Sequence, residues 1–262
     1  MRLLADTHGH LGPRHDPMRL LHGARDRLNV LARASGASEY RLILCLLDRA
    51  GHSALDAISN SKRRDGFESF PCPADPEAFR IRFPEGGPDL WICLGRQVAT
   101  AERLELLVLG HRPAVPDGLP LRETLSVLRG SGSGAIVLPW AFGKWTGRRG
   151  GLVRALLAEE PPESLLLGDS SLRPDGLPES RLLAFGRGRG FRIAAGSDPL
   201  PPAGEESAAG AYASELDADW EDERPTASLV RALTDPRIAL QTAGERSAPW
   251  TVLRRILRNV RD

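Results

Sequence analysis

The sequence predicts a single α/β barrel, a fold in which β-strands and α-helices alternate around a curved sheet. Its apolar runs, of which residues 3–5 and 40–47 are the first two, end in polar side chains. Between these runs lies a helical pattern that begins at Asp16-Pro17 and ends at Gly36. A strand, a helix and a parallel strand form one right-handed crossover, so both strands end at the same edge of the sheet. The length of 262 residues suits one such domain, covering residues 1–262, with an adequate core.

Further strands and helices follow along the chain. Apolar or alternating runs predict strands, and apolar residues at helical spacing predict helices. The predicted strands cover residues 79–83, 90–95, 104–110, 135–138, 165–171 and 191–198. The predicted helices cover residues 121–128, 152–158 and 178–185. Residues 199–226 are rich in proline, glycine and acids and predict an acidic surface loop, and residues 227–262 predict C-terminal helices.

The last predicted helix begins at Pro249 and is amphipathic. We expect its apolar face to pack on the body of the protein and its basic face to meet solvent, although a basic face can also bind nucleic acid. The apolar face comprises Trp250, Leu253, Ile256, Leu257 and Val260. The basic face comprises Arg254, Arg255, Arg258 and Arg261.

Composition and charge are those of an ordinary globular protein. Hydrophobic residues make up 41% and charged residues 26%, and the net charge of +1 does not indicate a nucleic-acid partner. Cys45, Cys72 and Cys93 lack C-x-x-C spacing, which favours reduced thiols and a cytoplasmic setting. The opening apolar run is too short for a signal peptide, and we expect no membrane span. The oligomeric state stays open.

The first strand ends in two histidines that could bind a metal ion together. His8 and His10 are two residues apart, and such residues point to the same side of a strand. Neutral imidazole is a ligand for zinc, manganese or iron, and Asp6 could add a carboxylate or fix a histidine tautomer. The alternative is that both histidines are merely solvated at a strand end. Because barrel enzymes keep their chemistry at the carboxyl ends of their strands, we favour a metal site.

A second candidate site is the aromatic and basic loop of residues 139–151, which follows the strand at 135–138. Lys144 and Arg149 could bind a phosphate, and Trp140 could stack on a ligand. The tryptophans of this loop could equally fill the mouth of the barrel.

Four motifs have an order and spacing that resemble the PHP family, named for polymerase and histidinol phosphatase. They are Asp6-Thr7-His8-Gly9-His10, Leu47-Asp48-Arg49, the stretch from Gly95 to Glu105, and Gly196-Ser197-Asp198-Pro199. The resemblance covers roughly residues 1–200 and implies a distorted (β/α)7 TIM-like barrel that hydrolyses phosphoesters with two or three metal ions. It also implies metal ligands at His8, His10 and Asp198, with His15 or Asp16 at the position of a further ligand.

The sequence departs from the PHP pattern at four positions. Arg49 stands where the family has a histidine, and Gln97 replaces a bridging glutamate. Trp140 and Pro199 replace two further histidines. Arginine cannot bind a metal ion and glutamine is a poor ligand, so we expect at most about one divalent transition-metal ion per chain.

The TatD-like deoxyribonucleases are an alternative resemblance within the same chemistry. Their Asp-Thr-His-x-His-Leu opening is similar to residues 6–11, and their late Asp-x-Pro resembles Asp198-Pro199. Their Gly-Glu-x-Gly motif has no good match in this sequence.

Two function classes follow from these patterns. In the first, the protein is a metal-dependent phosphoesterase whose ion activates water. Its catalytic residues would be Asp48, Arg49 and Lys144, with Arg96, Arg149 and Trp140 binding a small phosphorylated substrate. In the second, it is a catalytically degenerate barrel whose arginines hold an anionic ligand or protein partner. Asp48 could also serve only as a cap for the segment that begins at His52.

Overall fold

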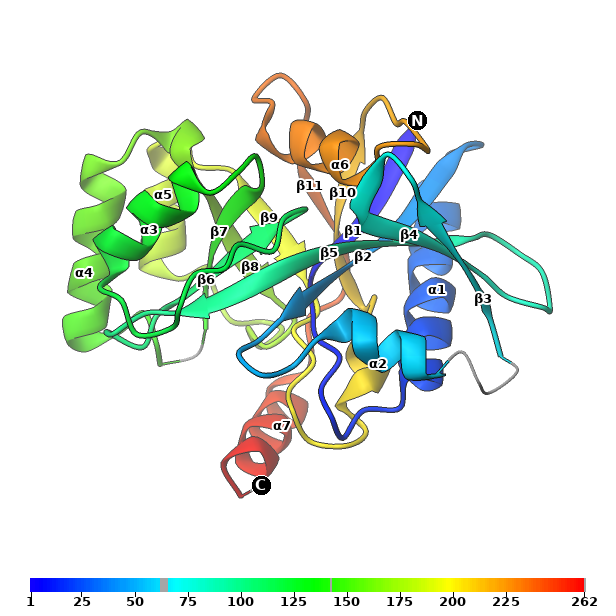
Figure 1. Cartoon of the computed structure of the whole chain (residues 1–262). Coiled ribbons are helices and arrows are strands. Elements are labelled where there is room, and N and C mark those ends of the chain that lie inside the picture. Colours follow the sequence, from blue (N-terminus) through cyan, green and yellow to red (C-terminus); the bar gives the residue numbers. More distant parts are fainter. Residues whose placement is uncertain (62–65, 142, 262) are drawn as a thin grey trace.

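The computed structural model describes residues 1–61, 66–141 and 143–261 and shows a TIM-like α/β barrel, as the sequence predicts (Figure 1). In the described residues the sheet runs in the order β11-β10-β1-β2-β5-β6-β7-β8-β9, and β4 and β3 extend it beside β5. The strands are β1 (Arg2–Gly9), β2 (Tyr40–Asp48), β3 (Glu68–Cys72), β4 (Asp75–Arg82), β5 (Leu90–Ala99), β6 (Glu105–Leu109), β7 (Ala135–Pro139), β8 (Leu166–Ser170), β9 (Ile193–Gly196), β10 (Tyr212–Asp217) and β11 (Gln241–Gly244). The helices are α1 (Pro17–Ala34), α2 (Ala54–Ser61), α3 (Leu121–Gly130), α4 (Gly147–Glu159), α5 (Arg181–Gly188), α6 (Pro225–Thr234) and α7 (Pro249–Arg261), with short 3-10 turns at Pro162–Ser164 and Glu205–Ala208.

The sheet is not all-parallel, because β4, β6 and β10 each run antiparallel to the strands beside them. β1, β2 and β5 are parallel neighbours, and so are β7, β8 and β9, whereas β6 is antiparallel to both β5 and β7. Only residues 100–104 connect β5 to β6, and a parallel crossover needs about a dozen residues or more. The short connection therefore forces β6 to run back along β5.

The barrel is nearly closed where β9 approaches β1. The amide of Asp198 donates a hydrogen bond to the carbonyl oxygen of His8 at 2.8 Å, and the Thr7 hydroxyl donates to the Ala195 carbonyl at 2.9 Å. A Cβ atom on Gly196 would lie 2.4 Å from the His8 nitrogen, so only glycine permits this approach. The edge strand β9 thus meets β1 through a few bonds near the ends of the two strands.

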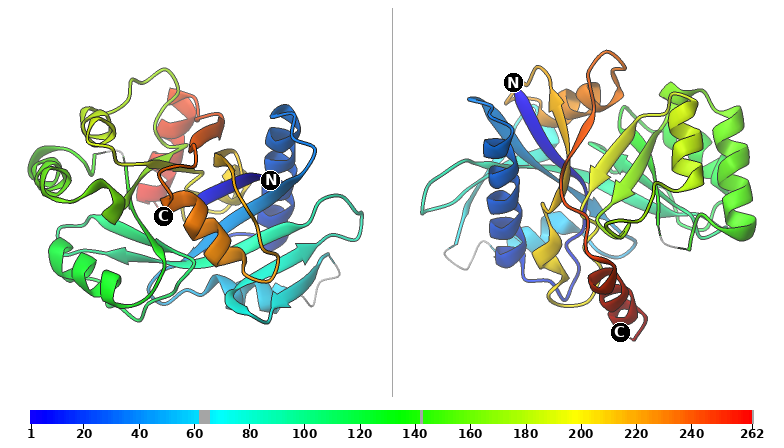
Figure 2. Two further views of the ribbon diagram at one scale, coloured as in Figure 1. Left: turned by 90° about the horizontal axis from the view of Figure 1, so that it is seen from above. Right: turned by 180° about the vertical axis from the view of Figure 1, so that it is seen from behind.

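Helices cover the outside of the sheet on two sides (Figure 2). α1 and α2 pack on β1 and β2, with Leu21 and Ile58 fully buried between the layers. α3, α4 and α5 pack on β6 to β9 through a second apolar layer that contains Leu138 and Leu157. The third cluster, which includes Ile43, lies among the remaining strand faces and α6. No helix among the described residues is long and apolar enough to cross a bilayer.

Residues 199–226 are not the surface loop that the sequence predicts. They contain the 3-10 turn and β10, which pairs antiparallel with β1. The acids of β10 alternate with buried residues, and Glu215 and Asp217 both form ion pairs with Arg2 on the outer side. Because acidic residues dominate the composition of this segment, the alternating pattern of β10 did not lead to a strand prediction. The C-terminal part also contains β11 in addition to the predicted helices.

α7 is rotated from its predicted orientation: Arg254 and Arg258 meet solvent as expected and Ile256 is half-buried, but most of the predicted apolar face is exposed. Trp250, Leu253, Leu257 and Val260 are exposed, whereas Arg255 is buried against the body. Arg258 donates a hydrogen bond to the Ala203 carbonyl at 2.7 Å, and the side chain of Arg261 lies outside the described residues. The buried ion pair of Arg255 with Glu205 overrides the apolar pattern.

Candidate metal centre

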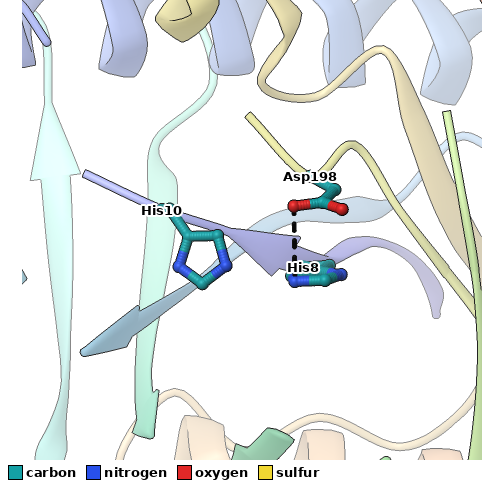
Figure 3. Close-up of side chains that lie close together, drawn as sticks. All are labelled: His8, His10 and Asp198. Atoms are coloured by element: carbon teal, nitrogen blue, oxygen red, sulfur yellow. Dashed lines mark ion pairs between the residues drawn. The ribbon is translucent and has the colours of Figure 1, made fainter. Parts of the chain in front are cut away.

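His8, His10 and Asp198 converge at the carboxyl ends of β1 and β9 (Figure 3). Each residue offers one ligand atom, and these atoms lie within 4.8 Å of one another. His8 Nε2 is 3.5 Å from Asp198 Oδ1, and all three residues are buried. The structure thus brings together three of the four predicted metal ligands, and a convergent set of two imidazoles and one carboxylate suits a divalent transition metal.

The hydrogen bonds of the two histidines leave nitrogen atoms available for an ion. The Nδ1 atom of His10 lies 3.1 Å from the carbonyl oxygen of Leu47 and must donate its proton there, which leaves the Nε2 lone pair unprotonated. The Nε2 atoms of His8 and His10 are buried and have no hydrogen-bond partner among the described residues. A buried nitrogen atom without a hydrogen-bond partner is costly, and a bound ion is one kind of partner that would offset this cost at both histidines.

Burial and nearby positive charge keep His10 neutral. Desolvation lowers its pKa well below 6.5, and the charges of Arg49 and His8 lower it further. A neutral imidazole is the form that binds metal ions. His10 is therefore in its ligand form at neutral pH.

Asp6 positions Asp198 and leaves no carboxylate oxygen for an ion. It accepts hydrogen bonds from the amides of Ser197 and Gly210, each at 2.8 Å, and from the Ser197 hydroxyl. Asp198 itself has a φ of 49°, in the left-handed region, which the neighbouring bonds must hold. Burial raises the pKa of Asp6 even though these three hydrogen bonds and a fourth, from the His8 amide, oppose the shift. Asp6 therefore acts as a structural anchor beneath the site.

Asp16, predicted as a further ligand, lies outside this cluster. It is exposed and caps α1, accepting hydrogen bonds from the amides of Met18 at 2.9 Å and Arg19 at 3.4 Å. Both ring nitrogens of His15 have hydrogen-bond partners. Nδ1 accepts a hydrogen bond from the Gly12 amide at 3.0 Å, so we place the proton on Nε2, which lies 2.7 Å from the Leu200 carbonyl oxygen. The Asp-Pro helix start explains why Asp16 serves as a cap.

Asp48 is held by structural bonds. Its Oδ1 atom accepts a hydrogen bond of 2.7 Å from the amide of Ala54 at the start of α2, so the capping interpretation describes its position. Its Oδ2 atom lies 3.5 Å from Arg112. Both carboxylate oxygens of Asp48 therefore contact partners outside the cluster of His8, His10 and Asp198.

Arg49 lies beside the candidate centre. It lines a cavity of about 360 Å³ together with His10, and it also lines a more open cavity of about 510 Å³. Its buried Nε atom has no hydrogen-bond partner among the described residues. A guanidinium in this position can bind an anion that enters either cavity.

The other predicted site residues do not belong to the cluster. Arg96 lines the open cavity, 3.6 Å from Asp117. Lys144 forms an ion pair of 2.5 Å with Glu105, and Arg149 donates to the Gly143 carbonyl at 3.0 Å. Trp140 is buried in the apolar layer beneath α3 and α4, where it cannot stack on a ligand in the cavity.

Several residues at the site were not predicted. His52 and Arg14 line the same cavity as Arg49, and Asn259 of α7 completes its wall. Arg255 contacts the backbone of Asp198. A histidine four residues after the strand-end Asp48 is a local signal that could have found His52, whereas the positions of Asn259 and Arg255 depend on how α7 packs against the body.

Comparisons with known proteins identify a fold. No protein-family model and no curated protein matches the sequence. PsfC from Pseudomonas syringae PB-5123 has a similar structure, with a TM-score of 0.56 and 14% identity over 99% of this chain and 96% of that chain. The lesion-specific endonuclease PfuEndoQ from Pyrococcus furiosus matches with a TM-score of 0.51 and 12% identity over 89% of this chain and 56% of its own. At these identities the similarity shows the fold alone, and that fold is the TIM-like α/β barrel predicted from the sequence.

Proposed function

We propose that the protein is a metal-dependent hydrolase of phosphoesters, related to the PHP type, with a reduced site for one divalent ion. The observation that carries the proposal is the convergence of His8, His10 and Asp198 within 4.8 Å, with both histidine Nε2 atoms buried and without a hydrogen-bond partner among the described residues. The similar fold of a lesion-specific endonuclease supports a phosphoester substrate. These observations make zinc, manganese or iron the ions to test.

The donor set fits one ion. Two neutral imidazoles and a carboxylate are three protein ligands, and catalytic sites with three protein ligands leave a position for water or substrate. A bound divalent ion supplies Lewis acidity and lowers the pKa of water. Among the described residues this is the one group of three such ligands that converges, which favours about one ion per chain.

The residues beside the cluster suit a small phosphorylated substrate. Arg49 offers a planar set of donors to phosphoryl oxygens, and its positive charge offsets the charge that a phosphate brings. His52 and Arg14 add basic side chains to the wall of the same cavity. The cavity volume of about 360 Å³ is in the range for small-molecule sites.

A second candidate is an anion-binding barrel without turnover. The carboxylates of Asp6, Asp48 and Asp169 all accept hydrogen bonds from protein groups. Asp169 accepts two from Arg173 and one from Tyr212. None of these carboxylates is free to act as a general base, which favours binding. In this case Arg49 would hold the anion and the metal would be structural.

The test combines metal analysis with activity. The purified full chain is treated with a chelator, reloaded separately with zinc, manganese and iron, and analysed for metal content. Each form is then assayed with p-nitrophenyl phosphate, bis(p-nitrophenyl) phosphate and a single-stranded DNA oligonucleotide. We expect about one ion per chain and turnover of at least one substrate.

Single-residue variants test whether metal binding and activity depend on the cluster itself and not on a general change in the protein. His10→Gln and Asp198→Asn should lose the ion and the activity. His22→Gln is the matched control, because His22 lies on α1 beside Glu85 and outside the cluster. Failure of the wild-type chain to retain any of the three metals would exclude the proposal, and retention of a metal without turnover would favour the binding alternative.

A further inference from the structure

A tight turn directly after β2 places Arg49 and His52 side by side. The amide of each residue donates a hydrogen bond to the carbonyl oxygen of the other, at 3.2 Å from Arg49 and 3.0 Å from His52. Residues that exchange both bonds in this way lie opposite each other, about 5.5 Å apart at Cα, with their side chains on the same side. The turn relies on Gly51, whose φ of 76° lies in the left-handed region that favours glycine. We call Arg49 and His52 the basic pair.

Two cavities meet at the basic pair. Arg49 and His52 both line a cavity of about 360 Å³, which the metal-ligand candidate His10 also lines, and a more open cavity of about 510 Å³. We call these the inner cavity and the open cavity. The buried Nε atom of Arg49 has no hydrogen-bond partner among the described residues, and His52 is exposed. An anion that binds the basic pair therefore has space on both sides.

The inner cavity suits an apolar or aromatic group. The apolar residues of its described wall are Leu11, Pro13, Leu47 and Pro201. Aromatic rings gain free energy when such a wall removes them from water. A ligand whose phosphoryl group binds the basic pair can place such a ring here.

The open cavity suits an uncharged polar group. The formal charges in its described wall cancel, because the arginines are Arg49, Arg96 and Arg112 and the acids are Asp48, Asp56 and Glu77. Arg112 pairs with Glu77 at 2.5 Å and with Asp48 at 3.5 Å. Arg96 lies 3.6 Å from Asp117. This wall offers a second phosphate no excess of positive charge, whereas hydroxyl and amide groups can form hydrogen bonds to these side chains.

We propose that the basic pair binds the phosphoryl group of a phosphodiester, with an aromatic or apolar group in the inner cavity and an uncharged polar group in the open cavity. The inference rests on the proposed function and narrows its substrates from phosphoesters in general to diesters. A monoester has one esterified group and fills only one of the two cavities. Because a monoester carries more negative charge than a diester at neutral pH, charge alone would favour the monoester. A preference for the diester therefore comes from its second group.

Ligand binding to the metal-free protein tests the proposal without turnover. The full chain is treated with a chelator and titrated calorimetrically with the p-nitrophenyl ester of thymidine 5′-phosphate, a diester with one aromatic and one uncharged polar group. Its two halves, p-nitrophenyl phosphate and thymidine 5′-phosphate, are the monoester references. We expect the diester to bind about tenfold or more tightly than either monoester, because both cavities are then filled.

A variant that fills the open cavity should affect the diester alone. Asp56→Trp places a large side chain in the wall of this cavity, and we expect the affinity for the diester to fall to that for p-nitrophenyl phosphate, which itself stays unchanged. Asp56→Asn keeps the size of the side chain and should retain the preference for the diester. Glu123→Trp is the matched control, because it makes the same kind of change at an exposed acidic position of α3 that is not among the described residues lining either cavity.

Arg49→Gln tests the basic pair itself. It should weaken all three ligands about tenfold or more, because each loses a charge-assisted hydrogen bond to its phosphoryl group. Unchanged affinity for all three ligands would place the phosphoryl group away from the basic pair and overturn the proposal.

Two further results would overturn the diester site. One is a diester that binds no more tightly than either monoester. The other is an Asp56→Trp protein that loses affinity for the diester and for p-nitrophenyl phosphate to the same extent. Turnover by the metal-loaded protein is measured separately, so a chain that prefers the diester but hydrolyses nothing with any metal would refute the hydrolase and support the diester site.

Discussion

Arg255 of α7 donates a hydrogen bond of 3.1 Å from Nη2 to the carbonyl oxygen of Asp198. Its Nε atom bonds Glu205 at 2.6 Å, and its Nη1 atom lies 3.1 Å from the Ser171 hydroxyl. The C-terminal helix therefore contacts the backbone of a proposed metal ligand through one buried side chain. Since Asp198 has a left-handed backbone conformation, this contact helps to hold the carboxylate toward the histidines.

Replacing Arg255 should weaken metal binding without removing a ligand. Arg255→Met leaves Glu205 as an unpaired buried carboxylate, and we expect about tenfold weaker metal affinity together with a destabilisation of about 3 kcal/mol. Arg255→Lys keeps the charge and should recover part of both losses. Isothermal titration with zinc and thermal unfolding measure the two effects.

The control for Arg255 is Arg254→Met, which removes an exposed arginine one position away. It should change neither the metal affinity nor the melting temperature appreciably. Equal zinc affinity in Arg255→Met and the wild type would show that the contact with Asp198 is not a positioning contact.

Arg49 should determine anion affinity at the candidate centre. Arg49→Ala removes a guanidinium from the cavity wall, and we expect phosphate binding to weaken by roughly 1.5 to 3 kcal/mol, the value of a charge-assisted hydrogen bond. Arg49→His restores the ligand type that the PHP pattern has at this position and should raise metal content. Phosphate titration and elemental analysis check the two variants.

Arg189→Ala is a control for Arg49, because Arg189 lies at the end of α5, away from the cavity. It should bind phosphate as the wild type does. If Arg49→Ala also keeps its phosphate affinity and Arg49→His its metal content, the anion must be bound elsewhere, and Lys144 and Arg149 become the residues to test.

Gly196→Ala should disrupt the contact between β9 and β1. The added methyl group would lie 2.4 Å from the His8 nitrogen and 2.5 Å from its Cβ atom, so His8 must move. We expect a loss of about 2 kcal/mol or more in stability and a marked loss of metal affinity. Gly151 lies in α4, and a Cβ atom added there has no described atom within 4 Å beyond its own helix backbone and chain neighbours. Gly151→Ala should therefore leave metal binding intact. A fully metal-binding Gly196→Ala protein would contradict the close approach.

Tyr212 should make the protein less stable in alkaline solution. Its burial and the charge of Asp169, to which its hydroxyl donates at 2.9 Å, raise its pKa from 10.0 to about 12. Above about pH 10 the unfolded chain loses this proton while the folded protein keeps it, so the stabilisation is complete below pH 10 and is lost as pH rises through about 12. Urea unfolding at about pH 9 and about pH 11 should therefore show a fall in the free energy of unfolding of up to roughly 1.4 kcal/mol for this group.

Tyr212→Phe should remove this contribution to the alkaline fall. The other tyrosine, Tyr40, donates to Asn29, and Tyr40→Phe should retain it. The same dependence on pH in both variants would mean that another group is responsible.

The predictable part of the fold was the part with strong local patterns. Apolar runs located strands such as β2, and the Asp16-Pro17 cap located the start of α1. β10 was missed because its outward acids dominate the composition, and its pairing with β1 is a long-range contact. For α7 the pattern correctly showed an amphipathic helix. It could not show which side faces inward, because Glu205, the buried partner of Arg255, lies far away in the sequence.

The residues of the candidate site also fall into those that local sequence patterns predict and those that they do not. His8 and His10 are recognisable from their spacing along one strand, and Asp198 from its position after the last parallel strand. Trp140 was misplaced because an aromatic residue after a strand can face either a cavity or a helical layer. Asp16 and Asp48 share the residue type of a ligand, yet local backbone amides occupy their oxygens. Only the three-dimensional structure distinguishes a capping carboxylate from a free one.

The narrow contact between β1 and β9 gives a bound ion a role in folding. His8 lies near the end of β1 and Asp198 directly follows β9, two strands that are not neighbours in the sheet order, so an ion held by both would act as a removable cross-link between the first and last parallel strands. If the ion stays bound to the unfolded chain, a cross-link between residues so far apart in sequence lowers the conformational entropy of that chain. If the ion binds only the folded protein, it stabilises the closed barrel by its binding free energy. After a chelator removes the ion, the barrel would open first where β1 approaches β9. Amide hydrogen exchange would then rise in β1 and β9 before it rises in β2 and β5.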